Sequence, residues 1–171
     1  MSEERAGPAA DKETGRLEAF SDGVFAVAIT LLAFDILKVP QAPAGQIFSA
    51  GDLARALSLS WPTYASFLIS FATILIMWLN HHSILKLVQK TDSVFLFANG
   101  FLLLLVTVVP FPTALLGDYL IEPAAPTAAA VYAGLFVVIS LAYILLWWAA
   151  AYRRPLLLPN IPPAAVRRRT L

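Results

Sequence analysis

The longest run of residues without a charged side chain spans positions 123–152 and reads PAAPTAAAVYAGLFVVISLAYILLWWAAAY. Two further runs without Asp, Glu, Lys, Arg or His lie between Arg55 and His81 and between Asp92 and Asp118. A helix needs about 20 apolar residues to cross roughly 30 Å of hydrocarbon, and each of the three runs is long enough. We therefore expect an all-α fold, a polytopic bundle of membrane-spanning helices.

The first hydrophobic stretch is interrupted by acids. Asp22 and Asp35 enclose 12 uncharged residues, which cover only about 18 Å of helix. Residues 17–37 nevertheless read as one helix, and acids at membrane depth should face protein or water rather than lipid. A secretory signal peptide fits poorly, because acids precede the apolar run and no suitable cleavage site follows it. The expected transmembrane domain covers residues 16–152, with its four spans near 17–37, 57–80, 93–116 and 126–151.

Composition and charge exclude several classes of protein. Hydrophobic residues make up 59% of the chain and charged residues 13%, whereas a soluble domain carries about 25% charged residues. The net charge of +1 and the absence of cysteine argue against a nucleic-acid partner, a disulfide scaffold and a thiolate site. We also expect no enzyme, because the sequence has no nucleophile–base pair, phosphate loop or metal triad at useful spacing. No cofactor or bound metal is expected.

The distribution of Lys and Arg predicts a multi-pass protein of the cell membrane with both termini in the cytoplasm. In that orientation the outer loops hold Lys38 and Arg55, and the inner segments hold the other ten basic residues. Residues 1–15 are expected to be a cytoplasmic N-terminal tail, and residues 153–171 a basic, Pro-rich cytoplasmic tail. Its arginine triplet at 167–169 is interpreted as an orientation signal, with binding to anionic head groups as the alternative.

Helical periodicity separates two faces of the first span. One face is an apolar stripe with a single hydroxyl, made by Phe20, Gly23, Val27, Thr30 and Phe34. Asp22 lies about 140° from Val27 on a helix, so its carboxylate points elsewhere. A buried acid without a partner is costly, which implies a polar network with other helices or another subunit.

Few residues can supply that network. His81 and His82 follow Asn80 at the end of the second span, and Asn99 lies one turn into the third. With antiparallel helices, these side chains and Asp22 share the cytoplasmic side of the membrane, where Asp22 or Arg16 could pair with a histidine. The alternative is a histidine pair at the membrane interface, with one ring packed against the protein and the other in contact with water. Metal or haem ligation is disfavoured, because adjacent histidines on a helix point about 100° apart.

Three motifs occur in a fixed order along the chain. Residues 16–32 read RLEAFSDGVFAVAITLL, residues 78–82 read WLNHH, and residues 109–117 read VPFPTALLG. The first resembles the Arg-x-x-x-Phe-Ser-Asp signature and the Ala/Ile/Thr run of the prokaryotic relatives of the endolysosomal potassium channel, transmembrane protein 175. The resemblance covers about residues 14–150.

The resemblance implies a homotetrameric, potassium-preferring cation channel in the lipid bilayer, with K+ as the permeant ion and four copies of the first helix around the pore. The implied constriction positions are Val27, Thr30 and Phe34, where the resembling proteins most often have Ile or Leu at the narrowest point. Residues implied to form a structural polar network are Arg16, Phe20, Ser21, Asp22, Asn80, His81, His82 and Asn99. The resembling proteins usually have six helices per subunit, so the four counted here indicate a short variant or a truncated chain.

The physical expectation is a hydrophobic constriction. A ring of valines offers no oxygen to replace hydration water, so a cation crosses by shedding part of its shell or when the pore widens. Two alternatives remain open. One is a non-conducting scaffold or assembly subunit, and the other is a small proton-coupled transporter that uses Asp22 and His81 as a relay.

Overall fold

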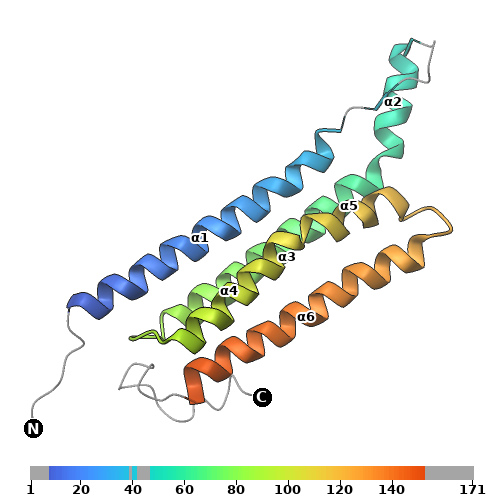
Figure 1. Ribbon diagram of the computed structural model, residues 1–171. Helices are drawn as coiled ribbons and strands as arrows, with labels where there is room; N and C mark the ends of the chain where they lie inside the picture. The colour runs from blue at the N-terminus through green and yellow to red at the C-terminus, as the bar shows by residue number, and fades with distance from the viewer. Residues whose placement is uncertain (1–7, 39, 42–46, 153–171) are drawn as a thin grey trace, which may run out of the picture.

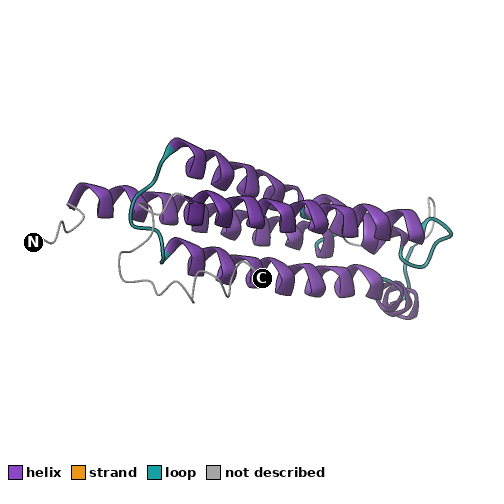
Figure 2. Ribbon diagram, turned by 90° about the horizontal axis from the view of Figure 1, so that it is seen from below, coloured by secondary structure: helices purple, strands orange, loops and turns teal. Residues whose placement is uncertain are grey.

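The computed structural model describes residues 8–38, 40–41 and 47–152, and the side chains from residue 13 onward within the first helix. Figure 1 shows a long bundle in which α1 and α6 run along opposite sides of the other spanning helices, and α2 projects from one end. Figure 2 shows the same helices running side by side from a second direction. The described residues form α1 (Pro8–Ile36), α2 (Ala50–Leu59), α3 (Trp61–Leu85), α4 (Ser93–Val108), α5 (Pro110–Tyr119) and α6 (Ala125–Tyr152).

Four segments of the described chain are long and apolar enough to cross a membrane, as the sequence predicts. They are Glu13–Ile36, Trp61–Leu85, Ser93–Tyr119 and Ala125–Tyr152. The third segment consists of α4 and α5, which meet at Val109. Pro110 and Pro112 cause this break because a proline inside a helix removes a backbone donor and clashes with the preceding turn. The third spanning segment is therefore interrupted between Val108 and Pro110.

The helix bounds differ from the sequence-based expectation at three places. Helix α1 begins at Pro8, inside the segment predicted as a tail, because proline suits the first turn of a helix. The second span begins at Trp61 rather than at 57, since Pro62 starts a new helix there. It also continues beyond position 80 to Leu85, whose side chain is buried in the core. The predicted tail at 153–171 lies outside the described residues.

Helix α2 is an element that the sequence reading did not include. The side chain of Ser49 accepts a hydrogen bond from the backbone of Asp52, and the Asp52 carboxylate accepts one from the backbone of Ser49. This reciprocal capping box satisfies two donors that a helix start otherwise leaves free. The Ser-x-x-Asp pattern is visible in the sequence and would have located this helix.

The centre of the bundle contains a buried hydroxyl cluster that joins three helices. The Ser70 hydroxyl on α3 lies 2.8 Å from the Thr113 hydroxyl on α5 and 3.1 Å from the Tyr132 hydroxyl on α6. Close packing accompanies it, since a methyl group on Gly117 of α5 would stand 2.9 Å from the Ser66 hydroxyl of α3. These contacts fix α3, α5 and α6 to one another, and they leave α1 as the helix attached along one side (Figure 1).

Candidate functional site: the first helix and its polar anchor

Helix α1 presents two sharply different faces. Ser21, Phe25, Ala28 and Leu32 are completely or almost completely buried against the bundle. On the other face, Val27 is 53% exposed and Phe34 is 65% exposed in the single chain. The stripe expected from periodicity is exposed at every one of its five positions: Phe20, Gly23, Val27, Thr30 and Phe34. A continuous exposed path therefore runs along most of the membrane-spanning part of α1.

Two acids of α1, Glu18 and Asp22, turn away from that path and contact α3. The indole Nε1 of Trp78 donates a 2.7 Å hydrogen bond to Oδ1 of Asp22. One turn earlier, Oε1 of Glu18 lies 2.8 Å from Nδ1 of His82. The rings of Trp78 and His82 stack with centroids 5.5 Å apart. Both carboxylates are thus shielded from lipid by partners on the neighbouring helix, as acids at membrane depth require.

A second set of polar contacts is fully buried and joins three helices. Nε2 of His81 on α3 lies 2.7 Å from Oδ1 of Asn99 on α4. The amide of Asn99 donates a 3.1 Å hydrogen bond to the hydroxyl of Ser21 on α1. The Phe25 ring covers His81, with ring centroids 5.3 Å apart. Because the Asn99 oxygen can only accept, the proton in the first bond sits on Nε2.

The structure brings five of the eight predicted network residues together and leaves three outside. Ser21, Asp22, His81, His82 and Asn99 make the contacts described above. Arg16, Phe20 and Asn80 are exposed instead. Asn80 lies about 100° from His81 around α3, on the side of the helix that is exposed at Leu79 and Asn80.

Two members of the network were not predicted as site residues. Glu18 and Asp22 are four residues apart on α1, and Trp78 and His82 are four residues apart on α3. Residues at this spacing lie above one another on one helix face. The matched pairs on two helices are the signal that could have identified Glu18 and Trp78.

The hydroxyl of Thr30 is held by its own helix. Thr30 Oγ1 donates a 2.8 Å hydrogen bond to the carbonyl oxygen of Val27. The donated proton points toward the backbone, so the lone pairs of the oxygen face the exposed side. Thr30 is therefore the one position of the stripe whose side chain offers an oxygen ligand.

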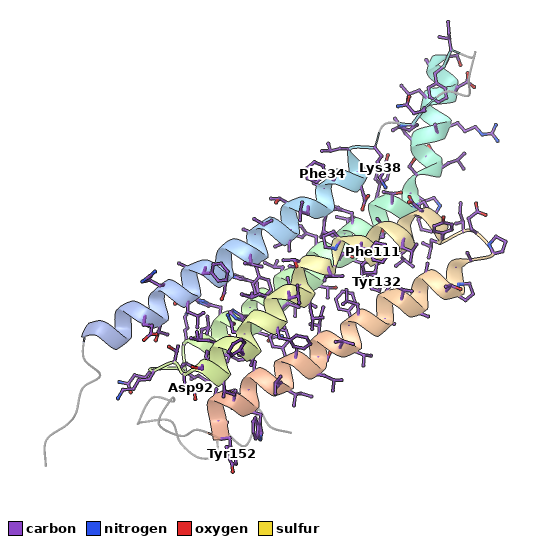
Figure 3. The ribbon with its side chains drawn as sticks, viewed as in Figure 1. Phe34, Lys38, Asp92, Phe111, Tyr132 and Tyr152 are labelled. Atoms are coloured by element: carbon purple, nitrogen blue, oxygen red, sulfur yellow. The ribbon has the colours of Figure 1, made fainter. Side chains whose placement is uncertain are left out.

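An ion-pair cluster ties the far end of α1 to the rest of the bundle. The ammonium of Lys38 lies 2.8 Å from Asp35 of α1 and 3.8 Å from Asp118 of α5. The hydrogen bond with Asp35 raises the pKa of Lys38. Figure 3 shows Lys38 next to Phe34 at this end, whereas Asp92 and Tyr152 lie at the opposite end of the bundle. Within the described residues, no group of three His, Cys, Asp or Glu side chains could hold a metal ion.

The family model of the endosomal/lysosomal potassium channel TMEM175 matches residues 16–110. A protein of Chamaesiphon minutus named as a potassium channel is 57% identical over 81% of this chain and 66% of its own length. A protein of Streptomyces collinus that is also named as a potassium channel is 46% identical over 91% of this chain and 73% of its own length. The human endosomal/lysosomal proton channel TMEM175 is 42% identical over 44% of this chain and 15% of its own length.

The fold is similar to a solved structure. The crystal structure of a lysosomal potassium-selective channel TMEM175 homolog from Chamaesiphon minutus matches with a TM-score of 0.80 and 52% sequence identity. The match covers 93% of this chain and 78% of that chain. The matches thus span about two thirds to four fifths of the length of the prokaryotic proteins and 15% of the human one. The matched residues of this chain include the α1 stripe and the polar contacts that hold α1, and the chain belongs to the TMEM175 family.

Proposed function

We propose that the chain is a subunit of a homotetrameric, potassium-preferring cation channel whose pore is lined by four copies of α1. The observation that carries this proposal is the continuous exposed stripe on α1, on a helix whose acids Glu18 and Asp22 contact α3 instead of facing the stripe. Two relatives named as potassium channels align with most of the chain. Four copies around an axis would cover the stripe and convert it into an ion path.

In this proposal, selectivity arises at a ring of apolar side chains that is followed by a ring of hydroxyl groups. Four Val27 side chains offer no oxygen ligand, so an ion passes only after it loses part of its hydration shell. K+ holds its water less tightly than Na+ and crosses more easily. One turn further along, four Thr30 oxygens accept the cation with the lone pairs that their backbone hydrogen bond leaves free. Phe34 forms the last and bulkiest ring.

The exposed face of α1 has the asymmetry that a closed ring of four requires. Ala19 and Ala26 lie on one edge of the exposed arc, and Phe20 and Leu31 lie on the other edge. The two edges are about 120° apart around the helix on average, somewhat wider than the right angle between two neighbours in a square. A cyclic tetramer joins two different surfaces of each copy. The small side chains on one edge of each copy therefore pack against the bulky side chains on the other edge of the next copy.

The helices beside α1 extend this contact. Helix α3 lies on the small edge, where Trp78 binds Asp22. Helix α4 lies on the bulky edge, and its Thr107 borders a groove of about 370 Å³ that crosses the exposed face of α1 and is lined also by Ala19, Phe20, Gly23, Val24 and Val27. Close approach of small and large side chains is the means by which helices associate in lipid, where apolar burial alone gives no advantage.

Ion flux tests the function. We expect vesicles that contain the protein and a potassium gradient to lose K+ passively, with no requirement for a proton gradient. A proton-coupled carrier would instead saturate and follow the pH gradient. A scaffold would release no K+, and this result would overturn the proposal.

Disulfide trapping tests the assembly, because the chain contains no cysteine of its own. The variant Ala19→Cys/Phe20→Cys should form covalent dimers, trimers and tetramers on mild oxidation. A bond between the two cysteines of one chain is disfavoured, since adjacent Cα atoms lie about 3.8 Å apart and disulfides usually need at least about 4.4 Å. Each single variant should give little beyond monomer. A product that stops at dimers in the double variant would show a two-fold contact and contradict the ring.

A further inference from the structure

Arg16 points in the same direction as the exposed stripe of α1. It precedes Phe34 by 18 residues, which is five full helical turns, so the two side chains leave the helix in one direction. Val27 deviates from this direction by about 20°. Arg16 is exposed in the single chain and lies at the end of the bundle where the described chain starts and ends (Figure 1).

Arg16 has no hydrogen-bond or ion-pair partner among the described residues. The acids nearest to it on α1 are directed elsewhere, because Glu18 contacts His82 and Asp22 binds Trp78, both on α3. Glu13 is exposed one turn closer to the N-terminus, about 60° around the helix from Arg16, on the side of the bulky edge. Each copy of α1 thus directs along the stripe one guanidinium that makes no ion pair within the described residues.

We propose that four Arg16 side chains form a positive ring at the pore mouth where α1 begins and α6 ends, and that this ring makes K+ flow unequal in the two directions. The inference rests on the proposed channel function and adds a residue that sets the direction of its current. Arginine stays charged at every physiological pH. A fixed positive charge lowers the local concentration of K+ at the mouth it surrounds, so K+ that enters from this side is depleted.

The opposite end of α1 carries the other sign. There Asp35 and Asp118 surround Lys38, which leaves one net negative charge per chain. Acidic rings are the usual lining of cation-channel mouths, and basic rings are typical of anion pores. The two ends therefore differ in their attraction for K+, and K+ enters less readily at the end that carries the basic ring.

The size of the effect follows from screened electrostatics. At 0.15 M salt the Debye length is about 8 Å. Four unit charges at roughly that distance from the axis in water deplete a monovalent cation about threefold. Current carried by K+ that enters from the terminal end should then be about threefold smaller than current in the other direction. At 1 M salt the Debye length falls to about 3 Å, and the two currents should become nearly equal.

Single-channel recording in symmetric KCl tests this inference. Arg16→Gln should remove most of the inequality between the two currents and leave the reversal potential in mixed K+ and Na+ unchanged, whereas Arg16→Lys should preserve the inequality. Lys86→Gln is the matched control, because Lys86 is an exposed cation that follows the last residue of α3 but does not lie on α1. An antibody against a C-terminal tag assigns the side on which the termini lie.

The unmodified chain also tests the inference, so the outcome does not depend on whether the Arg16 variants assemble. Currents that are equal in both directions at 0.15 M salt, or an inequality that persists unchanged at 1 M salt, would overturn the role of Arg16. Equal currents in the Lys86→Gln control would assign the effect to surface charge in general and likewise contradict it. A chain that conducts no K+ at all would instead defeat the proposed channel function.

Discussion

The hydrogen bond between Trp78 and Asp22 provides the most demanding test of how α1 is held. Its 2.7 Å length and the carboxylate acceptor mark it as charge-assisted. Hydrogen bonds to charged groups contribute about 1.5–3 kcal/mol in soluble proteins. Side-chain hydrogen bonds measured within membrane proteins average about 0.6 kcal/mol and reach about 1.7 kcal/mol. Because this bond is short, only partly buried and charged, we expect a coupling energy near the upper membrane value, about 1.5 kcal/mol.

A double-mutant cycle measures this coupling directly. The variants are Asp22→Ala, Trp78→Phe and their combination, unfolded reversibly in mixed micelles of increasing SDS content and followed by far-ultraviolet circular dichroism. The coupling energy from the cycle does not include the cost of losing the stacking between Trp78 and His82, because that cost occurs with and without Asp22 and cancels. A second cycle with Trp148→Phe is the matched control, since Trp148 is an exposed tryptophan on α6 and should show no coupling to Asp22.

The same variants separate a structural role from a selective one. Asp22→Ala should reduce the yield of tetramer on size-exclusion chromatography by several-fold, because the loss of about 1.5 kcal/mol corresponds to a factor of about ten in an equilibrium. The ratio of K+ to Na+ permeability in the tetramer that remains should stay unchanged. A coupling energy below about 0.3 kcal/mol, or a full yield of tetramer with altered selectivity, would refute the assignment of Asp22 as an anchor.

Thr30→Ala should keep conduction and lower the preference for K+ over Na+, because it removes the one oxygen ligand of the stripe. An unchanged reversal potential in mixed-ion solutions would count against Thr30. Ser140→Ala serves as the control, because Ser140 is exposed on α6 and its hydroxyl also donates to the backbone of its own helix. Gly117→Ala should lower the stability of the bundle by about 1 kcal/mol, since its methyl group would stand 3.2 Å from the Thr63 Cα atom. Gly134→Ala should not lower the stability, because its methyl group would meet no atom within 4 Å. Thermal unfolding of both variants in detergent compares the two effects. The Lys38 ion-pair cluster should stabilise the bundle below the ordinary lysine pKa of 10.5, and this contribution should be lost as the pH rises past the raised pKa of Lys38. The unfolding midpoint should therefore fall less steeply at high pH in Lys38→Met than in the unmodified chain. Parallel pH profiles of the two proteins would exclude a contribution of the cluster to stability.

The transmembrane architecture could be predicted from the sequence because the bilayer imposes a simple length requirement. Charge-free runs of this length have few alternatives to a spanning helix, so three of the four spans and the break near Pro110 follow from residue order alone, whereas the first span had to be recognised across its acids. Periodicity also separated the Val27 stripe from Asp22, because every helix has the same angular step. The family resemblance then suggested what the stripe could do.

The partners of the polar side chains were decided by the tertiary structure. The histidines were the expected partners of Asp22, yet the carboxylate binds Trp78, which lies about 60° from His81 around α3. His81 instead turns toward Asn99, and Arg16 and Asn80 remain at the surface. The sequence determines the angle between residues on one helix, whereas the rotation of one helix against another depends on how buried side chains such as Phe25 and Ile74 pack together. That packing minimises voids over the whole core at once, so no local pattern of residues contains it.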